Sequence, residues 1–136
     1  MKVLIDTNII LDILCQREPH LANSIAVLKL CGTHITGIIN AKQTADIFYV
    51  LKRAGKATSD VKTAIRKLSD NMKVVDIASD DVKNALDSDM DDYEDALLAF
   101  TGKRQRVEYI ITRNEKDFIN SPVPALNPHN FIEKFL

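Results

Sequence analysis

The sequence has few of the features that would place it outside the ordinary globular proteins. Its only two cysteines, Cys15 and Cys31, lie in apolar helical contexts, so a disulfide scaffold is excluded and free thiols in a core are expected. It contains no apolar run of 18 residues and no signal-peptide pattern, so we expect a cytoplasmic protein without membrane contact. Four glycines and four prolines, with no internal repeat or low-complexity tract, exclude fibrous and disordered chains.

The sequence also lacks an excess of charge of one sign. Its 18 Lys and Arg stand against 19 Asp and Glu, a formal net charge of −1, so no overall basic field points to a nucleic-acid partner. A local basic patch would still be enough to bind one. With 136 residues, of which 46% are hydrophobic, the chain can form one full core. We therefore predict a single domain over residues 1–136.

What the sequence does contain is an alternation of strand and helix patterns. The apolar run at 3–5 predicts a buried strand that ends at Asp6, with Thr7 or Asn8 capping the following helix. Further strands are predicted at 34–38, 73–76, 108–112 and 123–126, with amphipathic helical segments between them. This order predicts an α/β fold, a three-layer sandwich around a central, mostly parallel sheet of four to five strands.

Four aspartates are predicted to meet at one edge of that sheet. Asp6 and Asp117 follow the first and fourth strands, and Asp46 lies two turns into the helix after the second strand. Asp95 begins the helix that runs back before the fourth strand, so it lies above the same carboxyl edge, where parallel sheets bind ligands. Carboxylates about 4 Å apart repel by about 4 kcal/mol at a protein-like dielectric. The cluster therefore predicts protonation or a hard cation such as Mg²⁺ or Mn²⁺.

Each of these acids also has a purely structural interpretation. Asp6 can be a plain helix cap, and Asp117 a solvent-facing turn residue. Asp46 can pair with Lys42 or Arg53 on a surface helix. The acids at the start of the helix near residue 95 can simply complement its dipole. The case for a site rests on their joint arrival at one edge of the sheet and not on any single residue.

Three segments together resemble the PIN domain over nearly the whole chain. They are Val3-Leu4-Ile5-Asp6-Thr7-Asn8, Glu94-Asp95-Ala96-Leu97, and Ile111-Thr112-Arg113-Asn114 with Asp117-Phe118. PIN domains are metal-dependent ribonucleases, and many small members are VapC-type toxins. The resemblance therefore implies an Mg²⁺- or Mn²⁺-dependent endoribonuclease, and as partners RNA, a cognate antitoxin and a second copy of the chain.

The resemblance also assigns roles to residues. It implies that Asp6, Asp95 and Asp117 bind metal, and we add Asp46 as the fourth catalytic acid. Where the family usually has Glu, this chain has the shorter Asp46. Supporting positions are Thr7, Asn8, Glu94, Thr112 and Asn114, and the arginines best placed to bind substrate are Arg53 and Arg113.

The expected reaction is metal-assisted hydrolysis of a phosphodiester, in which a bound ion supplies hydroxide near neutral pH. Two alternatives remain open. One is a nucleic-acid-binding or protein-binding module with the same fold and little catalysis, which the shortened Asp46 favours. The other is a phosphotransferase with Asp6 as covalent nucleophile, as in haloacid-dehalogenase-like enzymes. Those enzymes usually carry a second Asp two residues on, where this chain has Asn8.

Overall fold

The computed structural model describes residues 1–135 and contains five strands, seven α-helices and one short 3-10 helix. In chain order they are β1 (Lys2–Ile5), α1 (Thr7–Leu14), α2 (Leu21–Thr33), β2 (Thr36–Asn40), α3 (Ala41–Arg53), α4 (Thr58–Asn71), β3 (Lys73–Val75), α5 (Ser79–Asp87), α6 (Tyr93–Arg104), β4 (Tyr109–Ile111), η1 (Glu115–Phe118), β5 (Ala125–Leu126) and α7 (Pro128–Phe135). No helix among these is long and apolar enough to cross a membrane.

The strands form one sheet in the order β3-β2-β1-β4-β5, and every neighbouring pair is parallel. The predicted sheet of four to five mostly parallel strands is confirmed, with five strands and no antiparallel pair. In the centre of the sheet Leu4 lies opposite Ile38 on β2 and Ile110 on β4. All five strands therefore end at the same edge.

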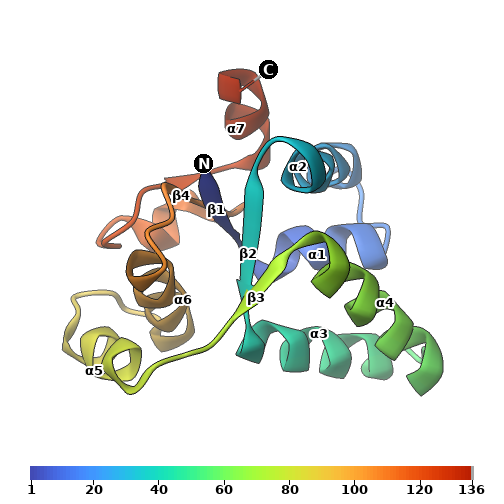
Figure 1. The fold of residues 1–136 in the computed structure, drawn as a ribbon, viewed down its shortest axis with the longest axis horizontal. Helices are drawn as coiled ribbons and strands as arrows, with labels where there is room; N and C mark the ends of the chain where they lie inside the picture. The colour runs from blue at the N-terminus through green and yellow to red at the C-terminus, as the bar shows by residue number, and fades with distance from the viewer. Residues whose placement is uncertain (136) are drawn as a thin grey trace.

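The side chains of the central strand alternate between two cores, and this alternation produces the three layers. Val3 and Ile5 pack with helices α1 to α4 and α7 on one face of the sheet. Leu4 packs on the other face with α6, which α5 covers from outside (Figure 1). All three side chains are fully buried, each worth roughly 1.5–3 kcal/mol of hydrophobic stabilisation.

The carboxyl ends of β1 and β4 are joined directly at the edge where ligands are expected. The backbone N–H of Asp6 donates to the carbonyl of Ile111 at 2.9 Å, so Asp6 and the residue after Ile111 lie side by side. Asp6, and not Thr7 or Asn8, occupies the N-cap position of α1, so the predicted capping residues are wrong. The Asp6 side chain makes no capping hydrogen bond, because its carboxylate faces the neighbouring strand end instead.

Candidate active site

An acidic cleft of about 330 Å³ lies at the carboxyl edge of the sheet. It is lined by residues from the ends of β1 and β4, from α3 and from the start of α6: Asp6, Thr7, Asn8, Asp46, Tyr49, Val50, Glu94, Asp95, Asn114, Asp117 and Phe118. All four aspartates predicted from the sequence are among them. Lys42 lies next to the cleft, where it pairs with Asp46 and Glu94. The fold therefore gathers acids from four separate segments around one hollow.

Asp6 forms the floor of the cleft between two strand ends. Its Oδ2 accepts a hydrogen bond from the Thr112 hydroxyl at 2.8 Å. Burial raises the pKa of Asp6, and the nearby Asp117 charge raises it further. The Thr112 hydroxyl, the Thr7 backbone N–H and the Arg113 charge oppose that rise. A bound cation would stabilise the charged form of the Asp6 carboxylate against the effect of burial.

Asp95 faces Asp6 from the first turn of α6. Burial is the main cause that raises the pKa of Asp95 to about 7, followed by the charges of Asp92, Asp6, Asp117 and Glu94. The helix start itself is capped by Asp92, whose Oδ1 accepts from the Asp95 backbone N–H at 2.9 Å. The carboxylate of Asp95 is therefore not needed as a cap.

We expect the stability of the metal-free protein to fall between about pH 4 and pH 7 because of Asp95. Its folded pKa of about 7 lies above the unfolded value of 3.8, so the folded state binds the extra proton in that interval and loses stability as the proton leaves. Asp95→Asn should remove this dependence and raise the Tm in a chelator at pH 7.5. Each kcal/mol is worth roughly 2–8 °C. A Tm that falls on this substitution would identify Asp95 as a structural residue.

The loop after β4 carries two further residues into the cleft. The Thr112 hydroxyl that donates to Asp6 also accepts from the Asn114 backbone N–H at 3.1 Å. The carbonyl of Asn114 in turn accepts from the Asp117 N–H at 3.0 Å, which begins the turn of η1. One fully buried threonine therefore connects the floor of the cleft to the loop that presents Asn114 and Asp117.

Asp46 lines the cleft and is also held by a neighbouring lysine. Lys42 Nζ lies 2.8 Å from Asp46 Oδ2 and 3.5 Å from Glu94 Oε1, so it bridges α3 and α6. The hydrogen bond that Lys42 donates to Asp46 raises the pKa of Lys42. The sequence left open whether Asp46 is a site residue or a partner of Lys42. In the structure Asp46 lines the cleft and also pairs with Lys42. Arg53, the other partner considered, lies over the ring of Tyr49 instead.

The donor chemistry of this cleft fits a hard divalent cation. Carboxylates are the ligands that Mg²⁺ and Mn²⁺ prefer, and a positive charge would offset the burial and the repulsion between carboxylates that raise the pKa of Asp6 and Asp95. Within residues 1–135 no three Asp, Glu, His or Cys side chains are already close enough to hold an ion. Binding would therefore require the carboxylates to turn toward one another.

Comparison with known protein families finds a match that covers most of the chain. A family model described as the PIN domain matches residues 2–116, which is most of the chain. The chain belongs to the PIN domain family. The resemblance read from the three sequence segments is thereby confirmed. A search of curated protein sequences found no match.

Solved structures show the same fold at low sequence identity. VapBC2 from Rickettsia felis, solved bound to a DNA fragment from their promoter, is 15% identical with a TM-score of 0.72 over 93% of this chain and 98% of that chain. A toxin-antitoxin complex from Klebsiella pneumoniae is 20% identical, with a TM-score of 0.68 over 93% and 97%. VapC20 from Mycobacterium tuberculosis, a sarcin-ricin loop cleaving toxin, is 13% identical, with a TM-score of 0.62 over 79% and 86%.

In this PIN domain Arg113 is held by a buried aspartate. Arg113 Nε lies 3.0 Å from Asp12 Oδ2, and Nη2 donates to Asp12 Oδ1 at 3.2 Å. Asp12 is fully buried on α1, and its Oδ2 also accepts from the Ser24 hydroxyl of α2 at 3.2 Å. The sequence offered one signal for Asp12, an acid placed among Ile9, Ile10 and other apolar residues. Arg113 was predicted from the sequence as a substrate contact, and Asp12 was not predicted as its partner.

Gln43 is a second residue that sequence analysis missed. Its amide donates to the Ile5 carbonyl at 2.7 Å and to the Thr7 hydroxyl at 3.2 Å, which ties α3 to the junction of β1 and α1. Its own carbonyl accepts from the Asn40 N–H, while the Asn40 side chain accepts from the Gln43 N–H. The Asn-x-x-Gln spacing of this capping box is visible in the sequence. Asn8 lies at the cleft and accepts from Arg17 at 3.4 Å.

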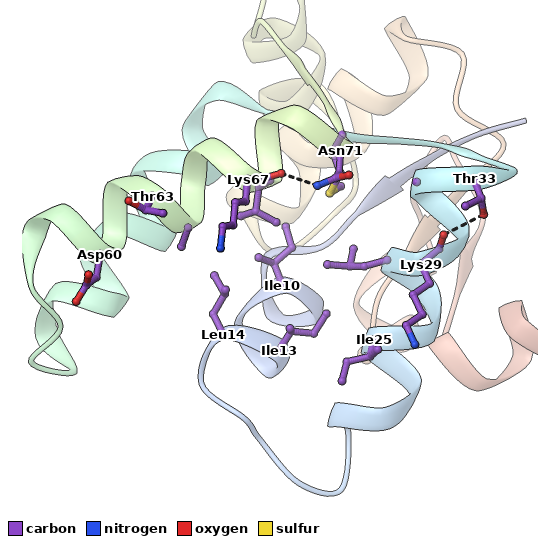
Figure 2. Close-up of a pocket in the computed structure, with 15 residues that line it drawn as sticks. Ile10, Ile13, Leu14, Ile25, Lys29, Thr33, Asp60, Thr63, Lys67 and Asn71 are labelled. Carbon is purple, nitrogen blue, oxygen red and sulfur yellow. Dashed lines mark hydrogen bonds between the residues drawn. The ribbon is translucent and has the colours of Figure 1, made fainter.

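A second hollow of the PIN domain is apolar and separate from the acidic cleft. This groove, of about 640 Å³, lies between α1, α2 and α4 and shares no lining residue with the cleft. Figure 2 shows Ile10, Ile13, Leu14 and Ile25 lining its interior, with Lys29, Asp60 and Lys67 at its sides. The lining chemistry suits apolar side chains and offers no group for phosphodiester chemistry.

Proposed function

We propose that this PIN domain is a metal-dependent endoribonuclease that hydrolyses RNA phosphodiester bonds. The observation that carries the proposal is the convergence of Asp6, Asp95 and Asp117 on one cleft. Electrostatic coupling links the three, because Asp6 and Asp117 both raise the pKa of Asp95. Such a cluster is costly for a folded protein unless a cation neutralises it.

The proposed role of each residue follows from its position in the cleft. Asp6, Asp95 and Asp117 would hold Mg²⁺ or Mn²⁺, which when bound lowers the pKa of water and stabilises charge on the phosphate. The Thr112 hydroxyl fixes the orientation of Asp6, and through Asn114 it fixes the loop that carries Asp117. Lys42 pairs with Asp46 on its own helix α3 and with Glu94 on α6, so it links the two acids from opposite helices. Arg53 and Arg113 stay the proposed contacts to substrate.

The test is cleavage of a fluorogenic single-stranded RNA, with Mg²⁺ and Mn²⁺ titrated over the same range. We expect cleavage by the wild-type chain that a chelator abolishes. Asp46→Glu, which adds the methylene group that the family usually has, should raise the rate several-fold, and Asp46→Ala should lower it. If Asp46 serves only Lys42, both variants should be near neutral, since exposed pairs contribute ~0–1 kcal/mol.

The competing functions give different results in the same assay. A binding module would bind RNA with an affinity that weakens with salt, and would cut in no variant. A phosphotransferase with Asp6 as nucleophile would release phosphate from a small phosphomonoester and leave the RNA intact. Wild-type protein that never cuts RNA at any metal concentration would overturn the nuclease proposal.

We also propose an antitoxin protein as partner and a homodimer as the assembly. The Klebsiella pneumoniae structure is a toxin-antitoxin complex, and the fold is shared with it. The apolar groove between α1, α2 and α4 could receive the apolar side of such a protein without touching the cleft. Co-purification with the product of an adjacent gene tests the partner, and the mass in solution tests the dimer.

A further inference from the structure

A third hollow of about 270 Å³ lies beside the acidic cleft and differs from it in chemistry. It is lined by His20, Asn23, Arg113, Asn127, Pro128 and His129, and none of these lining residues is acidic. We call it the donor pocket. It adjoins the acidic cleft through consecutive residues, because Arg113 lines the pocket and Asn114 lines the cleft.

The fold builds the donor pocket from three segments that are far apart in the sequence. His20 precedes the first residue of α2, and Asn127 to His129 form the start of α7, which packs beside α2. Arg113 comes from the loop after β4. Neither histidine stood out in the sequence, because the two lie 109 positions apart and only the fold brings them together. No ligand spacing marks them.

The pocket offers several unengaged hydrogen-bond donors. Arg113 donates a hydrogen bond to Asp12 through Nη2 only; its Nε lies 3.0 Å from Asp12 Oδ2 without forming a hydrogen bond, and no hydrogen bond within residues 1–135 uses its Nη1. An imidazole carries at least one N–H donor in either protonation state, so His20 and His129 both contribute. Asn23 adds an exposed amide. Asn127 is not counted, because its amide donates to Glu115 and its Oδ1 accepts from Asn130.

Besides Asp12, which binds Arg113, two further acids lie near the pocket without lining it. Glu133 Oε1 lies 3.3 Å from His129 Nε2, one turn further along α7. Both side chains of this pair are about two-thirds exposed, so the contact is weak and His129 can exchange it for another acceptor. Glu115 is bound by Asn127. The pocket therefore presents donors inward and keeps its nearest carboxylates outside.

We infer that the donor pocket binds a backbone phosphate of RNA other than the one that is cleaved. The inference rests on the proposed nuclease function and extends it to the path of the substrate. The acidic cleft repels a polyanion, so binding energy must come from groups close by that favour phosphate. Arginine, imidazole and amide N–H groups are such donors, and Asp12 holds the arginine in one position.

The test compares RNA binding and cleavage in two variants. For His20→Ala/His129→Ala we expect the Kd of a labelled single-stranded RNA in EDTA to rise about five- to tenfold, the effect of losing two hydrogen bonds. The KM for cleavage should rise similarly, with kcat changed less than twofold. His20→Gln/His129→Gln, which retains donors, should recover part of the affinity. His34→Ala is the matched control, because His34 is exposed at the opposite end of α2.

Asn23→Asp distinguishes phosphate binding from a structural role. A carboxylate in the first turn of α2 should stabilise the helix, while it should weaken RNA binding by repelling phosphate. A raised Tm together with a raised Kd supports the pocket. Unchanged Kd and KM in both Asn23→Asp and the double variant overturn it.

Failure of the pocket and failure of the nuclease proposal give different results. If the wild-type chain cuts RNA and the variants bind and cut as it does, the pocket proposal is wrong and the nuclease proposal stands. If the wild-type chain binds RNA without cutting it, and the variants bind more weakly, the pocket proposal stands and the nuclease proposal is wrong. No measurable RNA affinity in EDTA, with unchanged KM in the variants, overturns the pocket.

Discussion

Asp6→Asn is expected to reduce Mn²⁺-dependent RNA cleavage at least ~100-fold, because loss of a direct ligand should exceed the 10- to 100-fold effect of losing a supporting residue. The substitution keeps the shape of the side chain and an oxygen that can accept from Thr112. It removes only the negative charge that faces Asp95 and Asp117. Calorimetric titration should show the same loss as weaker Mn²⁺ binding, independently of any activity.

The Tm of Asp6→Asn tests whether unfolding is the cause of the lost cleavage. Burial raises the pKa of Asp6, so a neutral residue of equal size should maintain or raise the Tm of the metal-free protein. Asp91→Asn is the matched control, since Asp91 is an exposed acid close in sequence to Asp95 but outside the cleft. Asp6→Asn protein that binds Mn²⁺ and cuts RNA as wild type does would remove Asp6 from the site.

The parts of the fold that were predictable from sequence depend on local patterns. The buried run at 3–5 and its continuation into a helix identified the first strand and helix, because β-branched runs and amphipathic spacing are properties of short segments. Parallel topology then placed Asp6 and Asp117 at one edge. The position of Asp95 at the same edge followed from α6 running antiparallel to the strand after it. None of these steps required a long-range contact to be known.

The parts that were missed are long-range and side-chain specific. An acid among apolar residues marks Asp12 as buried, but nothing local shows that it pairs with Arg113, 101 positions later, so Arg113 was predicted only as a substrate contact. The meeting of His20 with His129 depends on α2 packing beside α7. The cap of α1 was predicted one or two residues too late, at Thr7 or Asn8, for a related reason. A capping pattern alone does not show that Asp6 would turn to Thr112.

The acidic cleft and the arginine beside it are connected through the fully buried side chain of Asp12. Its two carboxylate oxygens together accept from or pair with Arg113 Nε, Arg113 Nη2 and the Ser24 hydroxyl. Arg113 in turn lowers the pKa of Asp6 by its charge and lines the donor pocket. One buried carboxylate therefore determines where the positive charge next to the site is held.

Asp12→Ala is expected to destabilise the protein by ~3–5 kcal/mol, because it leaves the Arg113 charge and the Ser24 hydroxyl without their buried partner. Urea denaturation would measure this, and the Tm should fall by on the order of 10 °C. Asp46→Ala is the control, since its pair with Lys42 is exposed and worth ~0–1 kcal/mol. Asp12→Ala/Arg113→Met should recover part of the loss, because an apolar pair removes the unpaired charge. A loss below ~1 kcal/mol in Asp12→Ala, or no recovery in the double variant, would show that this ion pair does not hold the loop after β4 in place.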